Sequence, residues 1–452
     1  MMVGQAVDGW IVGPRIVSET VGMSTFWVIV AVLIGGSLMG PVGMFFGVPA
    51  FGIMKLVYEI QVKKIDNKME KITLIASSTM GLESVVKDEC IELGFENVKA
   101  FNGRVEFDGT IRDIVKANIH LRCADRVFIK MGEFKAVTFE ELFRNMKKIE
   151  WADYIPENGE FPISWVSSVK SKLFSKSDIQ KIAKKAMVEK MKERYKKDYF
   201  YEDGALYAIK IQAHNDIFIV MMDTSGDGLH KRGYRAIKNE APIKETMAAA
   251  LVKLSRWTGG ERPLLDPMCG TGTILIEAAM IARNIAPGAN RNFASEGWNI
   301  IPESEWIEVR DEAFSNEDYE KKVQIYGSDI DPETIEIAKE NIRKAGVEDD
   351  IILECKNFLD IEMEARQGCL ITNPPYGDRL LDEKAVERLY GLLGDVCRMR
   401  IPKWSYYIIT SYEEFEKCFG GKASKNRKLY NGGIKCYYYQ YYGENNGKNN
   451  KK

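Results

Sequence analysis

The second half of the chain alternates between short apolar runs and longer stretches with helical periodicity. The apolar runs lack polar alternation, as expected of strands buried on both faces of a parallel sheet. They are Leu264-Leu265, Val323-Gln324-Ile325-Tyr326, Ile351-Ile352-Leu353, Cys369-Leu370-Ile371-Thr372 and Tyr406-Tyr407-Ile408-Ile409. The pattern predicts a doubly wound, Rossmann-like α/β domain over residues 236–442, with any ligand bound beyond the carboxyl ends of the strands.

Residues 71–235 show a different pattern, in which shorter strands and helices interleave as in an α+β domain. Helical periodicity is present over residues 81–93 and 111–121, and a longer helix is predicted to follow Asp178 and to end near Tyr195. Strands are predicted at Ile72–Ala76, Val105–Phe107 and Val127–Ile129. This half therefore forms a region of its own, ahead of the α/β domain.

The two ends of the chain differ from the rest. Thr20 to Met54 is a run of 35 residues without a charge, and Phe26–Phe46 matches the roughly 20 residues of a membrane helix. The pattern predicts a membrane-like helical segment over 1–62, associating with a membrane through residues 20–57, and a polar linker over 63–70. A genuine anchor, a fusion remnant and a misjoined reading frame remain three interpretations of this segment.

At the carboxyl end, Tyr437–Tyr442 is predicted to form a last edge strand rather than a surface on which bases stack. Residues 443–452 are polar and are predicted to be disordered.

Charge is balanced over the whole chain, with 63 basic and 65 acidic residues and a net charge of −2. Any surface for a polyanion must therefore be local. Residues 168–197 hold 11 Lys or Arg against 3 acids, which indicates phosphate contacts, although a solvated helix face would show the same run. The candidates here are Lys170, Lys172, Lys176, Lys181, Lys184 and Lys185.

The eight cysteines are scattered without a CxxC pair, and the chain has only three histidines. This arrangement favours neither a zinc site nor a disulfide framework, so no metal is expected. A reducing cytoplasm is the expected compartment of the catalytic part, with membrane association if the first segment is genuine.

Two short segments, each directly after a predicted strand, carry candidate chemistry. They are Asp266-Pro267-Met268-Cys269-Gly270-Thr271-Gly272-Thr273 and Asn373-Pro374-Pro375-Tyr376-Gly377. The glycines permit positive φ and a close approach of backbone to ligand. A nucleotide-phosphate site is disfavoured, because GxxxxGK[ST] and a full GxGxxG are both missing. In this order the segments resemble those of S-adenosylmethionine (SAM)-dependent methyltransferases that act on an exocyclic base amine.

The resemblance implies a SAM site at the ends of the first strands. Asp266 would set the turn and engage the methionine amine, directly or through water. Asp329, after the second strand, would accept hydrogen bonds from the two ribose hydroxyls, and Ile330 would pack on the adenine. Asp331 and Pro332 are expected to start a helix over Glu333–Ala345 as its N-cap and first residue.

After the third strand, either Asn357 or Asp360 would contact the adenine amino group. Asp360 is preferred, with Phe358 as a stacking wall. The predicted cofactor residues are Asp266, Pro267, Cys269, Gly270, Gly272, Thr273, Asp329, Ile330, Asn357, Phe358 and Asp360.

The segment Asn373-Pro374-Pro375-Tyr376 is predicted to be catalytic. An exocyclic amine is a weak nucleophile, because its lone pair is delocalised into the ring. The Asn373 side-chain oxygen and the Pro374 carbonyl can both accept from the NH₂ group and compensate the positive charge that grows in the transition state. Pro375 adds rigidity to the loop, and Tyr376 can stack on an extruded base.

The first half resembles a ferredoxin-like plus THUMP arrangement, an RNA-binding module. The likeness rests on Val169-Lys170-Ser171-Lys172-Leu173 and Ser175-Lys176-Ser177-Asp178-Ile179. Gly226–Arg235, followed by Ala241–Thr246, resembles the junction of the ribosomal RNA large subunit methyltransferase K/L family, in its guanine-N2 half. The resemblance implies SAM-dependent methylation of guanine N2 in 23S rRNA, with Lys231, Arg232 and Arg235 on RNA phosphate.

Three other functions compete with this one. The first is the same chemistry on tRNA, and the second is adenine-N6 methylation of DNA, which the basic first half disfavours. The third is a non-catalytic RNA-binding or assembly factor. Separately, residues 3–60 resemble the C-terminal end of an autoinducer-2 exporter family permease, on Gly13-Pro14-Arg15-Ile16-Val17, Phe26-Trp27-Val28, Gly35–Gly40 and Gly47-Val48-Pro49.

Overall fold

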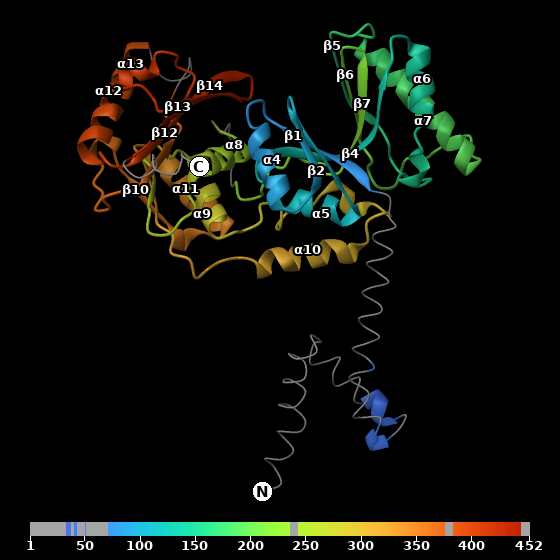
Figure 1. The fold of residues 1–452 in the computed structure, drawn as a ribbon, viewed down its shortest axis with the longest axis horizontal. Coiled ribbons are helices and arrows are strands. Elements are labelled where there is room, and N and C mark those ends of the chain that lie inside the picture. Colours follow the sequence, from blue (N-terminus) through green and yellow to red (C-terminus); the bar gives the residue numbers. More distant parts are fainter. Residues whose placement is uncertain are drawn as a thin grey trace. The chain divides into compact units, whose positions relative to one another are not determined.

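The computed structural model describes residues 33–37, 40–42, 50, 71–235, 243–375 and 383–443. The chain forms two compact units, Met1–Lys71 and Ile72–Lys452, and the elements of the second are labelled in Figure 1. Most of the expected membrane segment, the predicted linker 63–70 and residues 444–452 lie outside the described residues. Among those that are described, no helix has the length and apolar character needed to cross a membrane.

The first half of the second unit is built on one seven-stranded sheet, with the order β2-β3-β1-β4-β7-β6-β5. Its strands are β1 (Ile72–Ser78), β2 (Glu96–Phe101), β3 (Arg104–Gly109), β4 (Ala124–Lys135), β5 (Ile163–Val169), β6 (Ile209–His214) and β7 (Ile217–Asp223). Strand β4 pairs with β1 over its first part and with β7 over its second part. One strand thus joins the ferredoxin-like part to the part that carries the basic helix.

The helices of this half are α4 (Glu83–Glu92), α5 (Ile111–His120), α6 (Phe139–Lys147) and α7 (Lys176–Tyr195), with a short 3₁₀ turn at Trp151–Asp153. In α7, Ile179, Ala183, Ala186, Met187 and Met191 are buried. Their spacing places them on one face of the helix, so its lysines project from the other faces. Helix α7 packs against α6 and β5.

The second half is built on another seven-stranded sheet, with the order β10-β9-β8-β11-β12-β14-β13. Its strands are β8 (Leu264–Asp266), β9 (Ile325–Asp329), β10 (Ile351–Cys355), β11 (Cys369–Thr372), β12 (Ser405–Thr410), β13 (Lys425–Asn431) and β14 (Ile434–Tyr441). The first five are parallel to one another, and β14 runs antiparallel between β12 and β13. The predicted doubly wound sheet is therefore confirmed, and the strand order reverses between β8 and β11.

The expectation of an edge strand at Tyr437–Tyr442 was wrong. These tyrosines fall mainly in β14, which has a neighbour on each side, and β13 is the edge. The hydroxyl of Tyr438 is buried and donates to the Leu251 carbonyl. An aromatic run can therefore serve an interior strand that packs on a helix.

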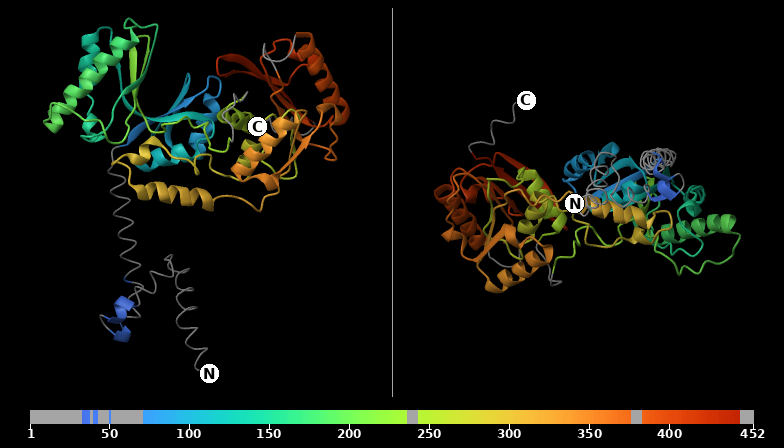
Figure 2. Two further views of the ribbon diagram at one scale, coloured as in Figure 1. Left: turned by 180° about the vertical axis from the view of Figure 1, so that it is seen from behind. Right: turned by 90° about the horizontal axis from the view of Figure 1, so that it is seen from below.

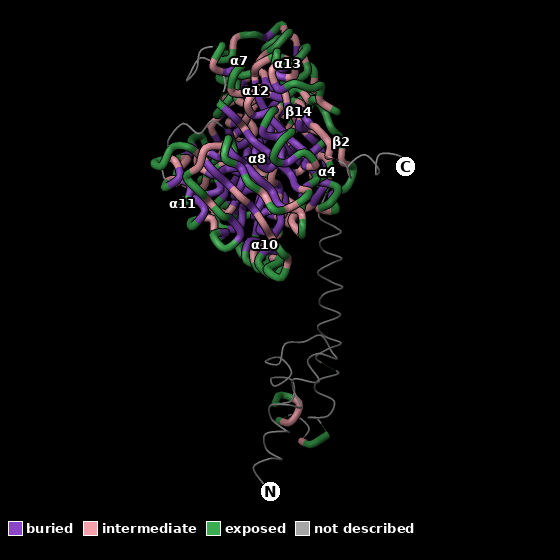
Figure 3. The backbone as a smooth tube through the Cα atoms, turned by 90° about the vertical axis from the view of Figure 1, so that its left-hand side faces the viewer, coloured by how far each residue is buried: buried purple, intermediate pink, exposed green. Residues whose placement is uncertain are grey.

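The helices of the second half are α8 (Glu245–Ser255), α9 (Thr273–Ala282), α10 (Glu303–Ser315), α11 (Pro332–Ala345), α12 (Glu383–Arg400) and α13 (Phe415–Phe419), with 3₁₀ turns at Ala294–Gly297, Glu348–Asp350 and Phe358–Asp360. Helix α8 is buried along nearly its whole length, and it runs through the purple interior in Figure 3. It packs against α9 on one side and α4 on another.

Ion pairs and buried hydrogen bonds attach the two halves to each other. Arg112 of α5 contacts Glu305, Glu308 and Glu312 of α10 at 2.6–3.0 Å; the two helices lie side by side in Figures 1 and 2. In the interior, Arg232 lies 3.3 Å from Glu277 of α9, and these side chains are 2% and 0% exposed.

Candidate active site

A cavity of about 580 Å³ lies at the carboxyl ends of β8, β9 and β11, where the strand order reverses. Both motif segments line it, and so do the residues that follow β9 and β10. Its lining is Ile243, Asp266, Pro267, Met268, Cys269, Gly270, Thr271, Thr273, Ile274, Asp329, Ile330, Thr334, Lys356, Asn357, Phe358, Asn373, Pro374, Pro375, Leu389, Asn431 and Ile434.

The glycine turn connects β8 to α9 at the base of this cavity. Gly270 and Gly272 have φ of +52° and +80°, which side chains with a Cβ rarely adopt. A Cβ added at Gly270 would meet nothing within 4 Å, so the turn leaves open space there. Gly272 does not line the cavity; it lies just before α9, and its role is to set the turn.

Asp266 ends β8 and is only 1% exposed. Its Oδ1 accepts from Thr372 Oγ1 at 2.7 Å and from the Met268 amide at 3.3 Å. Burial raises the pKa of this carboxyl to about 7, the two hydrogen bonds oppose the rise, and the charge of Asp329 adds to it. A carboxyl with this pKa changes its charge near neutral pH.

Asp329 ends β9 and ties two loops together. Its Oδ2 accepts from the Gly270 amide at 3.0 Å, and its Oδ1 accepts from the Asp331 amide at 3.1 Å. The next side chain, Ile330, is 69% exposed although it is apolar. Asp331 caps α11 as predicted, since its carboxylate accepts from Glu333 and Thr334 and Pro332 is the first helical residue.

The two candidates for the adenine contact, which follow β10, lie in different surroundings. Asn357 and Phe358 line the cavity, whereas Asp360 is exposed and lies outside its lining. Asn357 caps the following 3₁₀ turn through its Oδ1, which accepts from the Leu359 amide at 3.0 Å. Its amide NH₂ has no such role in the turn, so Asn357 is the better candidate for adenine.

Asn373, Pro374 and Pro375 follow β11 and line the cavity, whereas Tyr376 lies outside the described residues. The Oδ1 of Asn373 is buried and has no hydrogen-bond partner among the described residues. Such an atom is costly in a folded protein unless a ligand satisfies it. The Pro375 carbonyl accepts from Tyr390 of α12 at 3.3 Å, and Tyr390 also pairs with Thr410 at 2.8 Å.

Several residues that line the cavity, or that bond to its lining, were not among the predicted site residues. Thr372 immediately precedes the second motif, and its position on a strand end was the available signal. Asn431 and Ile434 flank a Gly-Gly pair, which is a hairpin signal, but the strand that precedes this pair was not predicted. For Leu389 and Tyr390, within a long helix, the sequence holds no signal.

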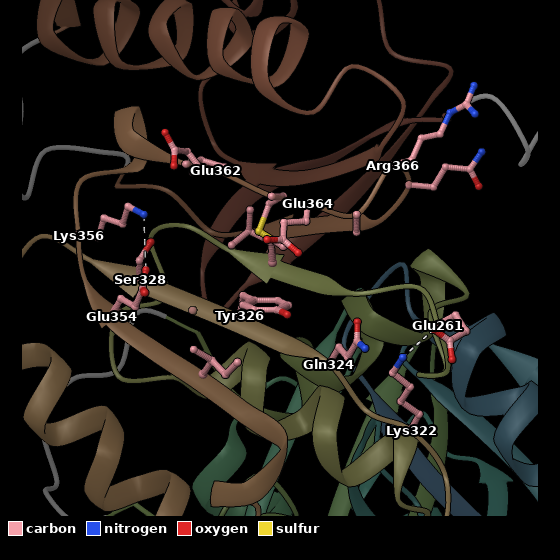
Figure 4. Close-up of a pocket in the computed structure, with 17 residues that line it drawn as sticks. Glu261, Lys322, Gln324, Tyr326, Ser328, Glu354, Lys356, Glu362, Glu364 and Arg366 are labelled. Atoms are coloured by element: carbon pink, nitrogen blue, oxygen red, sulfur yellow. Dashed lines mark hydrogen bonds and ion pairs between the residues drawn. The ribbon is translucent and has the colours of Figure 1, made fainter.

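A larger cavity of about 1290 Å³ lies over the sheet at β8, β9 and β10. Figure 4 shows the charged residues at its rim, among which Lys322 pairs with Glu261 and Lys356 with Glu354. It shares only Lys356 with the lining of the first cavity, and it contains neither motif. Its size therefore gives no reason to place the chemistry there.

The basic candidates separate into two groups. Five lysines on or before α7 are exposed and make no ion pair with another described residue: Lys170, Lys172, Lys176, Lys181 and Lys185. Lys184 instead bonds both carboxylate oxygens of Glu202 at 2.7 and 2.8 Å, and its Nζ lies 3.4 Å from the centre of the Phe161 ring. Its charge is therefore already compensated within the protein.

At the junction, Lys231 is exposed and pairs with Asp227 at 2.7 Å. The expectation that Arg232 contacts RNA phosphate was wrong, because its guanidinium is buried against Glu277 and the Leu229 carbonyl. Arg235 is partly buried beside Glu245. Within the described residues no group of three or more His, Cys, Asp or Glu is placed to hold a metal ion.

Comparisons with known families divide the chain into four matched stretches. Residues 73–128 match the RlmL ferredoxin-like domain, 136–223 the THUMP domain, and 232–440 the RMKL-like methyltransferase domain. Residues 1–63 match the AI-2E family transporter. The two resemblances stated above for the separate parts of the chain are thereby confirmed.

Among curated proteins, the chain is 47% identical over 376 residues to "Putative RNA methyltransferase YpsC" of Bacillus subtilis (strain 168), covering 83% of this chain and 97% of that protein. A crystal structure from Clostridium difficile 630, a "possible methylase", has 48% identity and a TM-score of 0.80 over 83% of this chain and 99% of its own. SMU.472, solved in complex with S-adenosylhomocysteine (SAH), has 45% identity and a TM-score of 0.79, covering 83% and 98% of the two chains.

These relatives match both the cavity-bearing domain and the half that precedes it. The cofactor is SAM, in agreement with the product that SMU.472 binds. The chain, in which ferredoxin-like and THUMP domains precede the catalytic domain, belongs to the RMKL-like family of SAM-dependent RNA methyltransferases.

Proposed function

We propose that this protein methylates the exocyclic N2 amine of a guanine in 23S rRNA. The observation that carries the proposal is the buried Asn373 Oδ1, which lacks a partner among the described residues and belongs to a loop that lines the SAM cavity. An acceptor of this kind is suited to an NH₂ donor. The choice of ribosomal RNA as substrate, and of guanine N2 as the methylated atom, rests on the resemblance to the K/L family.

The cavity residues fit SAM. Two carboxylates stand at neighbouring strand ends, Asp266 for the cationic methionine amine and Asp329 for the ribose hydroxyls. The exposed Ile330 and the Phe358 ring supply apolar surface for adenine, and the Asn357 NH₂ supplies a donor for a ring nitrogen. The open space at Gly270 leaves room for the ligand beside the backbone.

In the reaction, the cofactor supplies a methyl group bonded to a positively charged sulfur, which becomes a neutral thioether when the base nitrogen takes the methyl. Asn373 Oδ1 and the Pro374 carbonyl accept from the two N–H groups, which directs the nitrogen lone pair away from the ring. They also stabilise the positive charge that develops on nitrogen. The methylated amine then releases one proton to solvent, and most of the rate gain comes from positioning.

The loop that contains Asn373, Pro374 and Pro375 is stabilised by a residue outside the cavity lining. Tyr390 donates to the Pro375 carbonyl and pairs with Thr410 at the end of β12. Leu389, Asn431 and Ile434 provide a further wall around the space beside Asn373. This wall is apolar at Leu389 and Ile434, as suits the face of an extruded base.

RNA binding is assigned to the first half, proposed as residues 71–235, with the catalytic domain as 236–442. The exposed lysines Lys170, Lys172, Lys176, Lys181 and Lys185 are the proposed phosphate contacts. A cytoplasmic location of this enzyme agrees with its eight free cysteines.

The test uses purified full-length protein, labelled SAM, and 23S rRNA and tRNA that lack modifications. After the reaction, the RNA is digested and its nucleosides are identified by mass spectrometry. N2-methylguanosine in 23S rRNA supports the proposal. The same nucleoside in tRNA alone would overturn the choice of RNA, and N6-methyladenosine would overturn the choice of base. If no methyl group is transferred to free RNA or to partly assembled large ribosomal subunits, both the choice of RNA and the choice of base are overturned.

A further inference from the structure

We propose that Arg235 is a positioning residue for SAM: it fixes the part of the cavity that receives the amino-acid end of the cofactor. This inference rests on the assignment of the 580 Å³ cavity to SAM. Arg235 itself does not line that cavity. It acts through Ile243 and Thr273, which do.

The guanidinium of Arg235 joins the first turns of two helices. Its Nη2 donates to the Ile243 carbonyl at 2.8 Å and to Thr273 Oγ1 at 3.3 Å. Its Nε lies 2.6 Å from Glu245 Oε1, and because the Nε–H is not aimed at that oxygen the contact is an ion pair. Glu245 begins α8 and Thr273 begins α9, so a single side chain sets the separation of these two helix starts.

The position of Arg235 disagrees with a contact to RNA phosphate. Its side chain is 24% exposed and that of Glu245 is 5% exposed, so the pair is largely shielded from solvent. Among the described residues, the partners of the Arg235 guanidinium all belong to the methyltransferase half. A basic residue that lies at the end of the RNA-binding half therefore serves the cofactor site.

The contact to Thr273 has a directional consequence. When its oxygen accepts from the guanidinium, the hydroxyl keeps its own hydrogen to donate, and an acceptor in the cavity is the partner that remains. Thr273 is the first residue of α9, where the helix dipole also favours an anion. The carboxylate of the methionine moiety has both properties, since it is an anion and only accepts hydrogen bonds.

The experiment measures binding of two ligands to the full-length protein without RNA, by isothermal titration calorimetry. SAH contains the amino-acid end, whereas 5′-methylthioadenosine contains the adenosine and the sulfur but lacks the carboxylate. Arg235→Gln is expected to weaken SAH binding about tenfold or more, the size of a lost hydrogen bond to a charged group. The affinity for 5′-methylthioadenosine is expected to stay within about twofold.

Two further variants identify the route. Arg235→Lys keeps a cation and is expected to recover part of the SAH affinity. Thr273→Val removes the hydroxyl at constant shape. In the Thr273→Val protein, Arg235→Gln should reduce the SAH affinity by less than it does in the wild type, because the two residues act through one hydrogen bond. Arg343→Gln is the matched control, because Arg343 is 64% exposed on α11 and its one ion-pair partner among the described residues is Glu340.

The outcomes are separable. Unchanged SAH affinity in Arg235→Gln, or an equal loss for both ligands together with a lowered melting temperature, would overturn the proposal. If Asp329→Ala also leaves SAH and 5′-methylthioadenosine binding intact, the assignment of the cavity itself has failed. If Asp329→Ala abolishes binding while Arg235→Gln does nothing, only the role of Arg235 has failed.

Discussion

Thr372 donates a 2.7 Å hydrogen bond to Asp266, and both side chains are buried. Thr372 is the residue before Asn373, and Asp266 opens the glycine turn, so this bond joins the cofactor side of the cavity to its substrate side. Thr372 and Asp266 are 106 residues apart along the chain, yet their hydrogen bond connects the two segments that carry the motifs.

SAM binding is expected to release a proton near neutral pH. Asp266 has a pKa of about 7 in the free protein because of burial, and a cationic amine beside it would favour the ionised form. At pH 7, about half a proton should therefore leave per SAM bound. Calorimetry in buffers of different ionisation enthalpy measures the number, and Asp266→Asn should reduce it to near zero. A release that Asp266→Asn leaves unchanged would refute this role.

The same carboxyl makes a prediction for stability without ligand. Its pKa is higher in the fold than the usual value of about 4, so the native state binds more protons than the unfolded state between about pH 4 and 7. Its contribution to the free energy of unfolding should fall as the pH rises through that window. Urea titrations at several pH values should show a flatter profile for Asp266→Asn than for the wild type. Thr372→Val should raise the pKa further, because it removes a hydrogen bond that lowers it.

Removal of the Asn373 side-chain oxygen should reduce turnover and leave cofactor binding intact. Asn373→Ala is expected to lower kcat by about 10²–10³, the cost of one lost group that stabilises transition-state charge. Asn373→Asp retains an acceptor and should be less impaired. Methyl transfer and SAH affinity measured on the same preparations separate the two effects, and an equal loss of SAH affinity would point to a cofactor role instead.

Breaking the buried pair of Arg232 and Glu277 should destabilise the protein. Arg232→Ala leaves Glu277 charged in the interior, with an expected loss of about 3–5 kcal/mol in the free energy of unfolding. Urea unfolding measures this loss. RNA affinity, measured below the unfolding transition, should be unchanged; a selective loss of RNA binding at full stability would restore the original expectation of a phosphate contact.

The exposed lysines of the first half should contribute to RNA binding independently of its sequence. Lys176→Ala, Lys181→Ala or Lys185→Ala should each weaken binding and reduce the slope of log K against log salt by about 1. Lys184→Ala serves as the contrast, because its charge is held by Glu202. Fluorescence anisotropy over a salt series gives the slopes. If all four variants reduced the slope equally, Lys184 would contact RNA phosphate despite its ion pair with Glu202.

Local signals in the sequence were sufficient for the five parallel strands of the catalytic sheet and for both motifs, but not for the antiparallel pair β13 and β14. Asp266 to Thr273 and Asn373 to Pro375 are short segments whose glycines and prolines determine their own backbone. The apolar runs also locate the parallel strands, because strands buried on both faces differ in composition from exposed ones.

Charge pairing could not be predicted in the same way. Arg232 and Lys231 are adjacent in the sequence. Arg232 is buried and forms an ion pair with Glu277, 45 residues away, whereas Lys231 faces solvent. Asn357 and Asp360 stand at opposite ends of one 3₁₀ turn, and only the first lines the cavity. The burial of a polar side chain depends on the elements packed around it, and no local pattern encodes that packing.

Strand β4 has one more consequence. It pairs with β1 and β7 in a fixed hydrogen-bonded register, and the basic helix α7 packs against β5 of the same sheet, so α7 is held in place relative to the ferredoxin-like part. That part is in turn attached to the catalytic half through Arg112 and Arg232. We therefore expect the separation between Lys176 and Asn373 to vary little, so that the protein would favour an RNA whose target base lies at the matching distance from the phosphates that the lysines contact.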